Sequence, residues 1–241
     1  MIVLFTDFSY QGSYVGELKA AILGNNESTC IIDLMHDAPM FNIKYSAKLL
    51  SCLIDKFPMN SIFCCVVDPG VGSERDAIAI KNKDQYFVGP NNGLFEYIIR
   101  EESNLEFYQI TYHPKDTSNT FHGRDIFAPV CSQLLHKDFQ HIKEISHDSV
   151  KRINWSDNLA EIIYIDVYGN LVTGINTKDI SKDSILIYKK RRIPYARTYS
   201  EMNSNKYYWT SNSKNLLEIT TNSRNTAKSL SSQIGESVEF E

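Results

Sequence analysis

The stretch VVDPGVGSER, residues 66–75, joins an apolar run to a turn that contains an aspartate, a proline and two glycines. The run from Ile62 to Val67 predicts a strand buried in the interior of the protein, and Asp68 stands where that strand would leave its sheet. In open α/β sheets, ligands bind at the carboxyl ends of the strands, and Gly70 and Gly72 would let the backbone approach a ligand closely. Asp68 is therefore a candidate site residue, although Asp and Pro are also ordinary turn formers.

Strands and helices alternate on both sides of this stretch, up to about residue 150. Such alternation predicts an α/β unit with a mainly parallel sheet and helices on both faces. Strands are expected at 2–6, 29–34, 62–67 and 106–112, a hairpin from 77–80 and 86–88, and helices at 14–23, 43–57 and 126–135 and within GPNNGLFEYIIR, residues 89–100.

The pattern changes after about residue 155, where strands follow one another without helices between them. Polar turns such as Tyr168-Gly169-Asn170 separate these strands, which predicts a smaller antiparallel β domain. The strands are expected at 161–168, 171–176, 184–188, 207–209 and 216–221. We place an N-terminal α/β domain at residues 1–152 and a C-terminal, β-barrel-like domain at 158–241.

The composition excludes several classes of protein. The 241 residues include 25 Lys and Arg and 29 Asp and Glu, a formal net charge of -4, so no broad basic surface is expected and nucleic acid is not the expected partner. No apolar run approaches the roughly 20 residues that span a bilayer, so no membrane partner is expected either. The N-terminal MIVLFTDF predicts a first strand and not a signal peptide. Five cysteines without metal-ligand spacing predict buried, reduced thiols in a cytoplasmic protein.

Two polar clusters follow the first two predicted strands. In TDFSYQGSYVG, residues 6–16, Asp7 ends a strand in the position where nucleotide-binding α/β proteins place a carboxylate on a ribose diol. A helix cap or turn is an equally good interpretation, and the three-glycine dinucleotide fingerprint is absent. In IIDLMHD, residues 31–37, Asp33, His36 and Asp37 fit either a metal site or a hydrogen-bonded loop.

Three further clusters lie beyond them. Arg75 is close enough in sequence to fold back onto Asp68, and an arginine neighbour favours the charged carboxylate, so Asp68 is expected to be ionised and a weak base. In TFHGRDIFAP, residues 120–129, His122 stands at a helix entrance, facing a ligand or serving a structural role. Beside it, Arg124 pairs with Asp125 or another acid, and Asp125 caps the helix. In IDVYGNLVTGI, residues 165–175, the amide of Asn170 suits an adenine edge or a plain hairpin turn.

Taken in order, these motifs resemble one family. TDF at residue 6, VVDPGVGSER, FVGPNNGLF, TFHGRDIFAP, DVYGNLVT and NSKNLLEI at residue 212 match the S-adenosyl-L-methionine hydrolases (adenosine-forming), also called S-adenosyl-L-methionine hydroxide adenosyltransferases. These enzymes are relatives of the fluorinase and chlorinase. The resemblance covers nearly the whole chain, and it implies a Rossmann-like N-terminal domain and a C-terminal β domain. It also implies a homotrimer whose sites lie between the N-terminal domain of one subunit and the C-terminal domain of the next.

The same resemblance implies roles for individual residues. The polar triad of the family falls on Asp68, Arg75 and His122, and the ribose-binding carboxylate on Asp7. Gly123 occupies the position of a hydroxyl residue in the halide pocket of the halogenases, so water is the implied nucleophile, with no metal and no cofactor. On the C-terminal side, the implied substrate contacts are Asn170 for adenine, Ser213 and Lys214 for the methionine carboxylate, Asp166 near the amine, and Tyr199 and Ser223.

Four positions depart from the family pattern. Ser9 replaces a Gly after TDF, and Gly12 stands where a second Asp is usual, which puts one contact to the methionine end in doubt. Gly174 replaces an Asn after NLVT, and Asn215 replaces a Gly in the NS-x-G segment. Two other functions remain open: a non-catalytic adenine-nucleoside-binding protein, and a metal-dependent hydrolase with a site of Asp7, Asp33, His36, Asp68 and His122.

Overall fold

Residues 1–24 and 27–241 are described by the structure, a computed structural model in which the chain divides into two compact units, Met1–Asn154 and Trp155–Glu241. Each unit has its own hydrophobic core. The N-terminal core includes Leu4 and Cys64 from the sheet. The C-terminal core is built around Trp209, which is 1% exposed.

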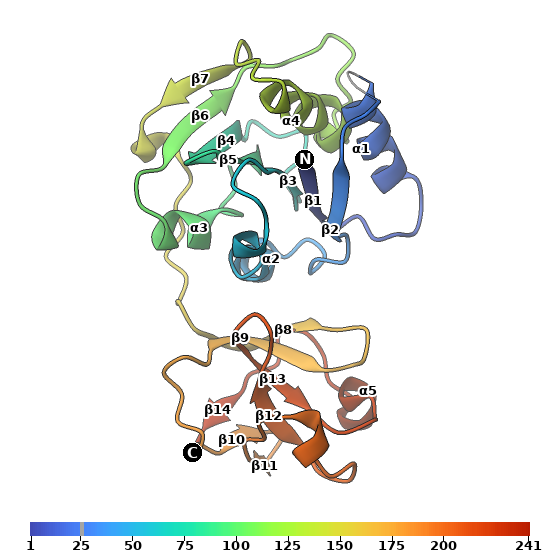
Figure 1. Ribbon diagram of the computed structural model, residues 1–241, viewed down its shortest axis with the longest axis vertical. Coiled ribbons are helices and arrows are strands. Elements are labelled where there is room, and N and C mark those ends of the chain that lie inside the picture. Colours follow the sequence, from blue (N-terminus) through green and yellow to red (C-terminus); the bar gives the residue numbers. More distant parts are fainter. Residues whose placement is uncertain (25–26) are drawn as a thin grey trace. The chain divides into compact units, whose positions relative to one another are not determined.

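A seven-stranded mixed sheet forms the N-terminal unit, in the order β2-β1-β3-β5-β4-β6-β7 (Figure 1). The first four strands in this order are parallel, and β4, β6 and β7 run antiparallel to their neighbours. The expected parallel arrangement therefore holds only for the first half of the sheet, because the β4–β5 hairpin reverses the chain and β6 and β7 extend its edge. The strands are β1 (Ile2–Thr6), β2 (Ile31–Met35), β3 (Ile62–Val66), β4 (Ala77–Asn82), β5 (Gln85–Pro90), β6 (Glu106–Ile110) and β7 (Ile142–Ile145).

Helices cover both faces of this sheet, as expected. Figure 1 shows α1 (Tyr14–Leu23) and α4 (Ala128–Leu135) on one face, and α2 (Ile43–Ser51) and α3 (Glu96–Glu101) on the other. The predicted helix at 43–57 is shorter in the structure: α2 ends at Ser51 and only a 3-10 turn, Ile54–Lys56, continues it before Pro58. The predicted helix at 126–135 is preceded by a π-helical turn, η2 (Gly123–Phe127).

The position of β1 in the sheet determines where a ligand can bind. From β1 the chain passes to β2 on one side, and it later returns to place β3 on the other side of β1. Ligands of open α/β sheets bind at such a switch point, outside the carboxyl ends of the strands. Asp7 directly follows β1, and Asp68 lies two residues after the last residue of β3.

The C-terminal unit contains two antiparallel sheets instead of one closed barrel. One sheet has four strands in the order β12-β13-β9-β8, and the other has three in the order β11-β10-β14. Strands β11 and β14 and the helix α5 were not predicted. Their bounds are β8 (Leu159–Ile165), β9 (Leu171–Asn176), β10 (Leu186–Tyr188), β11 (Arg191–Ile193), β12 (Tyr208–Ser211), β13 (Leu216–Thr220), α5 (Thr226–Leu230) and β14 (Glu239–Phe240).

The cysteines are free thiols, but not all of them are buried. Cys64, Cys65 and Cys131 are buried, whereas Cys30 is exposed and Cys52 is half-buried. The expectation of five buried thiols is thus correct for only three of them. Among the described residues, no helix has the length and apolar character required to cross a membrane.

Candidate active site

A tight turn after β3 brings Arg75 back onto Asp68. Within this turn, Val71 N donates to Asp68 O at 3.2 Å and Ser73 N to Gly70 O at 3.1 Å. Gly72 has a φ of 79°, and a Cβ there would lie 2.3 Å from the carbonyl oxygen of Asn119, so only glycine fits. The turn therefore fixes the spacing between the aspartate and the arginine.

Arg75 and Asp68 form a nearly buried ion pair. Arg75 Nε lies 3.0 Å from both Asp68 oxygens, and a second guanidinium nitrogen also contacts Oδ2. The side chains are 11% and 4% exposed. The guanidinium carbon also lies 5.3 Å from the centre of the Phe127 ring. This paired geometry orients one face of the carboxylate and leaves Asp68 able to accept further hydrogen bonds.

His122 joins this pair through its Nδ1 atom. Arg75 Nη2 lies 3.0 Å from that nitrogen, and because a guanidinium can only donate, Nδ1 must be the acceptor. Burial, and then the positive charge of Arg75, lowers the pKa of His122. The imidazole is therefore neutral near pH 7, with its proton on Nε2. In this arrangement His122 presents an N–H donor, and not a free basic nitrogen, on its other side.

A cavity of about 320 Å³ lies beside these groups, within the N-terminal unit. Its lining brings together Asp7, Asp68 and His122 from three separate motifs. Asp7 Oδ2 accepts a hydrogen bond from Phe41 N at 2.9 Å. Burial raises the pKa of Asp7, and backbone hydrogen bonds, that from Phe41 first, oppose the shift. Asp7 and Asp68 thus line one cavity at the ends of adjacent parallel strands.

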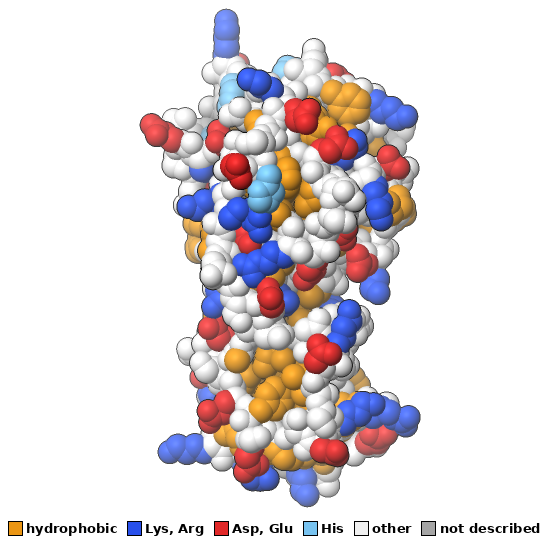
Figure 2. Space-filling model, turned by 90° about the vertical axis from the view of Figure 1, so that its left-hand side faces the viewer, with side chains coloured by type: hydrophobic (Ala, Val, Ile, Leu, Met, Phe, Trp, Pro, Cys, Tyr) orange, Lys and Arg blue, Asp and Glu red, His pale blue; other side chains and the backbone are white. Residues whose placement is uncertain are grey.

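Aromatic rings form a wall of this cavity that we did not predict from the sequence. The Phe8 ring centre lies 5.8 Å from that of Tyr14 and 5.6 Å from that of Phe121, and Tyr14 lies 5.2 Å from Phe121. Phe8 belongs to the TDF motif and Phe121 to the FHG motif, and Tyr14 follows TDF by six residues. Membership of these motifs is the signal that would have identified the two phenylalanines. Figure 2 shows apolar side chains at the surface of both units, and the exposed ones in this unit include Tyr14, Met40 and Phe41, which line the cavity.

Gly123 lies against the same aromatic rings. A Cβ at this position would be 3.2 Å from ring atoms of both Phe8 and Phe121. Any larger residue would thus push one of these rings. The Phe8 and Phe121 rings can therefore pack as they do only because residue 123 has no side chain.

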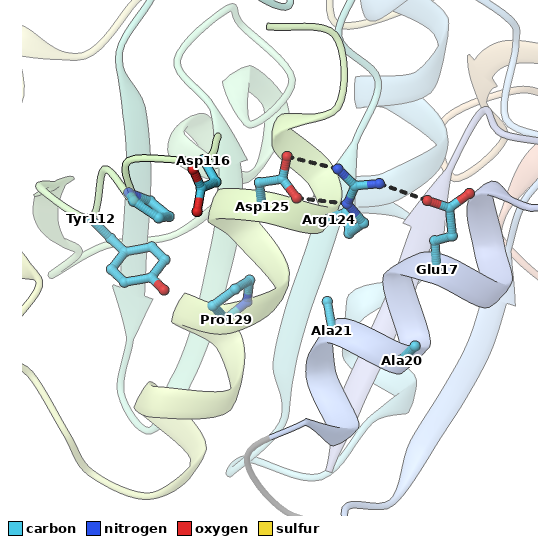
Figure 3. Close-up of a pocket in the computed structure, with 9 residues that line it drawn as sticks. Glu17, Ala20, Ala21, Tyr112, Asp116, Arg124, Asp125 and Pro129 are labelled. Atoms are coloured by element: carbon cyan, nitrogen blue, oxygen red, sulfur yellow. Dashed lines mark hydrogen bonds and ion pairs between the residues drawn. The ribbon is translucent and has the colours of Figure 1, made fainter. Parts of the chain in front are cut away.

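Arg124 does not line this cavity, although it follows Gly123 in sequence. Figure 3 shows its guanidinium between Glu17 of α1 and Asp125 of η2. The distances are 2.7 Å to Glu17 and 2.6 and 3.0 Å to the two oxygens of Asp125. Asp125 also accepts from Ser118 N at 2.8 Å. The predicted pairing of Arg124 is correct, since it binds both Asp125 and a second acid. The predicted helix cap is wrong: Asp125 lies within η2, whose N-cap is His122, and it bonds to the backbone of Ser118 upstream of the helix because its side chain points back to that loop.

The expected substrate residues of the C-terminal unit line a second cavity, of about 470 Å³, within that unit. Asp166, Asn170, Tyr199, Ser213 and Lys214 all contribute to it. Ser223 does not line this cavity and instead lines a neighbouring hollow that Asn170 and Tyr199 share. The structure thus groups these residues by unit, with Asp7, Asp68, Arg75 and His122 in the other unit.

Asp166 and Asn170 bond to each other across the turn between β8 and β9. Asp166 Oδ1 accepts from the backbone nitrogens of Tyr168 and Asn170 at 3.0 and 2.8 Å. Its Oδ2 accepts from Asn170 Nδ2 at 2.9 Å, and Asn170 Oδ1 accepts from Thr220 at 2.5 Å. The Asn170 amide, in a residue 6% exposed, therefore has one N–H left for a ligand.

Glu218 is a second carboxylate of this cavity, and sequence reasoning missed it. The residue is 4% exposed, and Tyr199 Oη donates to its Oε1 at 2.7 Å. Burial raises the pKa of Glu218, and the nearby Asp166 raises it further. Lys214 and Arg197 supply positive charge to the same lining. Glu218 lies in NSKNLLEI, five residues after Ser213. It is a lone acid in an otherwise apolar strand, and this pattern could have identified it as a site residue.

The departures from the family pattern have local structural reasons. Ser9 and Asn215 adopt left-handed conformations, with φ of 61° and 58°, which explains why glycine suits both positions. A Cβ at Gly12 would meet nothing within 4 Å, but its φ of 92° favours glycine, so the backbone and not the available space sets this residue. A Cβ at Gly174 would lie 2.5 Å from Leu159, so this residue serves packing between strands.

The metal-site interpretation receives no support from the geometry. Within residues 1–24 and 27–241, no group of three or more His, Cys, Asp and Glu side chains could hold a metal ion. Both ring nitrogens of His36 already have partners, Thr6 Oγ1 at 2.7 Å and Asp33 Oδ1 at 3.1 Å. Asp33 and His36 therefore belong to a hydrogen-bonded loop.

The structure is that of an α/β protein in which the Asp68–Arg75–His122 cluster lies beside a cavity of about 320 Å³. Comparison with known proteins identifies its family. Residues 2–145 match the N-terminal domain of the SAM hydroxide adenosyltransferases and residues 160–239 match their C-terminal domain. The chain belongs to this family, as its motifs predicted.

Known relatives include hydrolases and a halogenase. The chain is 32% identical to the (R)-S-adenosyl-L-methionine hydrolase of Methanocaldococcus jannaschii, over 95% of this chain and 91% of the relative. It is 22% identical to the fluorinase of Nocardia brasiliensis, over 80% of this chain and 77% of that protein. A crystal structure of an uncharacterized conserved protein from Thermotoga maritima superposes with a TM-score of 0.88 at 29% identity, covering 100% of this chain and 99% of the other.

Proposed function

We propose that this protein is an enzyme that hydrolyses S-adenosyl-L-methionine to adenosine and L-methionine. The observation that carries the proposal is the Asp68–Arg75–His122 cluster, which lies beside a cavity that also contains Asp7. Relatives that align with 95% and 92% of this chain are (R)-S-adenosyl-L-methionine hydrolases. The Asp68–Arg75–His122 cluster supplies an acceptor, a positive charge and a donor for the water that attacks the substrate.

The reaction is a displacement at the 5′ carbon of the ribose. A water oxygen forms a bond to this carbon while the carbon–sulfur bond breaks, and its electron pair remains on sulfur as a neutral thioether. The leaving group therefore needs no general acid. The water must lose one proton, and water has a pKa near 15.7 in bulk, so the site has to orient the water and receive that proton.

The triad supplies these two functions. Asp68 accepts a hydrogen bond from the water. From the sequence we expected it to be a weak base, but with Nδ1 of His122 occupied it is the acceptor that remains in the triad, so it takes the proton as the carbon–oxygen bond forms. His122 donates from Nε2 to the water oxygen, because its Nδ1 is occupied by Arg75. Arg75 holds both groups and stabilises the negative charge that develops on oxygen. A well-placed base contributes about 10² to 10⁴ in rate, and in-line positioning of the substrate supplies much of the rest.

We assign the ribose and the sulfonium to the first cavity. Asp7 has one carboxylate that accepts from both hydroxyls of a ribose diol. The Phe8, Tyr14 and Phe121 rings lie where a positively charged sulfur is attracted to an aromatic face. This wall therefore favours the charged substrate over the neutral methionine product.

The amino-acid end fits the second cavity. Ser213 and Lys214 are donors for the methionine carboxylate, and Asp166 and Glu218 are acceptors for its ammonium group. Asn170, with Tyr199 and Ser223 near it, reads the adenine edge through its remaining N–H. By analogy with the family, we propose a homotrimer in which the N-terminal unit of one copy and the C-terminal unit of another share one substrate.

Product analysis in heavy-oxygen water tests this function. The purified protein is incubated with S-adenosyl-L-methionine and a chelator, and the nucleoside is analysed by chromatography and mass spectrometry. Adenosine with heavy oxygen at its 5′ hydroxyl, and an equal amount of methionine, are expected. Activity that the chelator abolishes would indicate a metal-dependent hydrolase, and binding of adenosine without turnover would indicate a nucleoside-binding protein.

A further inference from the structure

Four polar side chains that the proposed reaction does not use form a line of hydrogen bonds that ends next to Asp7: Lys19, Asp33, His36 and Thr6. Lys19 Nζ is 2.6 Å from Asp33 Oδ2, and Asp33 Oδ1 is 3.1 Å from His36 Nε2. His36 Nδ1 is 2.7 Å from Thr6 Oγ1. His36 and Thr6 are both 0% exposed. Polar groups buried in this way persist only when they are hydrogen-bonded, and these two are bonded to each other.

The direction of these hydrogen bonds follows from the groups at one end. The Asp33 carboxylate, which also binds the Lys19 ammonium, can only accept, so His36 Nε2 carries a proton. In the neutral imidazole Nδ1 is then an acceptor, and the Thr6 hydroxyl donates to it. A lone pair on Thr6 Oγ1 remains for Phe8 N, which lies 3.3 Å away. The line thus ends on the backbone of the residue that follows Asp7.

The same residues join the two loops that hold the Asp7 carboxylate. Thr6 O accepts from Ala38 N at 3.2 Å, and His36 O accepts from Ser9 N at 2.5 Å. The second loop then supplies Phe41 N to Asp7 Oδ2. Ser9 and Phe41 both have left-handed backbones, with φ of 61° and 57°. Such conformations are unfavourable for these residue types and persist where surrounding contacts hold them.

We propose that Thr6 and His36 are positioning residues for nucleoside binding, which hold the Asp7 carboxylate in the orientation that accepts the ribose diol. They act through the Phe8 backbone and through the contact between the two loops, and neither touches the ligand. The inference rests on the proposed function, because it assigns the purpose of the network to the ribose contact of Asp7.

The test compares Thr6→Val with Thr6→Ser. Valine has nearly the shape of threonine but no hydroxyl, so it removes the donor to His36 and the acceptor for Phe8 N, whereas serine keeps both. Adenosine affinity by calorimetry, and KM and kcat, are measured for each variant. Thr6→Val is expected to weaken adenosine binding and to raise KM by about tenfold, with kcat changed by less than about threefold, because the network acts on binding and not on the triad. Thr6→Ser is expected to remain within about twofold of the wild type.

A second pair of variants, Asp33→Ala and Lys19→Ala, tests the proposal if the Thr6→Val protein does not fold. Asp33 and Lys19 are only partly buried, with 30% and 34% of their side chains exposed. Asp33→Ala removes the acceptor for His36 and is expected to weaken adenosine binding by about threefold or more, whereas Lys19→Ala stays within about twofold. The proposal is overturned if Thr6→Val binds adenosine as tightly as the wild type does. Where Thr6→Val does not fold, the same result in Asp33→Ala overturns it. An equal loss of adenosine affinity in Thr6→Ser and Thr6→Val also overturns it. A wild-type protein that fails to bind adenosine overturns the proposed function first, and with it this inference.

Discussion

The hydrogen bond from Arg75 to His122 decides which nitrogen of the ring is available for chemistry. With Nδ1 occupied by a guanidinium N–H, the outer nitrogen of the neutral imidazole donates. His122 thus differs from a histidine that removes a proton directly with its outer nitrogen. The difference can be measured with a substituted residue that donates a hydrogen bond but is not a base. Such a residue can replace a donor histidine, but it cannot replace a histidine that removes a proton.

We expect Asp68→Asn and His122→Ala to reduce kcat by at least about 10² while the substrate still binds. His122→Gln, which keeps an amide N–H donor, should retain about tenfold more activity than His122→Ala. Single-turnover kinetics at saturating substrate provide the measurement. Equal loss in the Gln and Ala variants would contradict the donor role and indicate that His122 acts as a base.

The pH dependence follows from the lowered pKa of His122. Burial and Arg75 disfavour the imidazolium, so activity should be constant from pH 8 down to the ordinary histidine value of about 6.5 and fall only below it. Removing the arginine charge in Arg75→Gln should raise the pKa of His122, and Arg75→Lys should keep it low. NMR titration of the ring protons measures both, and a lower value in Arg75→Gln would contradict the assignment.

Asp7 presents a conflict between stability and binding. Its pKa is raised by burial, so the folded protein prefers the protonated carboxyl, and this contribution to stability is lost as pH rises through that pKa. At neutral pH the charge is therefore destabilising. Asp7→Asn should raise Tm by about 1 °C, a small amount because solvent screens a partly exposed group. The same variant should weaken adenosine binding by about tenfold or more, because the neutral amide binds the diol less strongly. A lower Tm would show that the carboxylate is needed for the fold.

At the scale of elements, the π-helical turn η2 places His122 and Gly123 against the cavity. The sequence predicted a helix at 126–135 but not the π turn at its start. The extra residue in such a turn is accommodated by packing of distant rings and not by local propensity. The antiparallel half of the sheet was missed for a similar reason. The pairing of β6 with β4 and β7 is a contact between distant segments, whereas the β4–β5 hairpin is local and was predicted.

Gly123→Ala tests whether this turn depends on the aromatic rings. The added Cβ would lie 3.2 Å from Phe8 and Phe121, so a ring must move by a few tenths of an ångström. We expect a loss of about three- to thirtyfold in kcat/KM, because the rings line the cavity that we propose for the substrate. Gly16→Ala is the matched control, since a Cβ in α1 meets nothing within 4 Å, and it should raise Tm slightly. Unchanged activity in Gly123→Ala would show that the rings adjust freely.

For the whole molecule, the division of the candidate site residues between two units explains what the sequence could and could not predict. The strand-end positions of Asp7 and Asp68 were readable from local pattern, because each follows a buried run. Glu218 and the wall formed by Phe8, Tyr14 and Phe121 were not, since their meaning depends on which side chains surround them in space. In the C-terminal unit only Asn170 was a candidate from its own chemistry, as an amide in a tight turn. The other residues, such as Asp166, were found by family resemblance, because polar turn residues are common.

A shared site predicts that two inactive variants can restore each other. Asp68→Asn disables the triad in the N-terminal unit, and Lys214→Glu reverses the charge proposed to meet the substrate carboxylate in the C-terminal unit. If each substrate is bound by the N-terminal unit of one copy and the C-terminal unit of another, equal co-expression leaves about one quarter of the sites with both halves intact. We therefore expect about a quarter of wild-type activity in the mixed protein. Asp68→Asn with His122→Ala is the control, because both lie in the N-terminal unit and no site regains a complete triad. Sedimentation should show a trimer for every mixture, and a mixture of the complementing pair that stays inactive as a trimer would place the whole site within one chain.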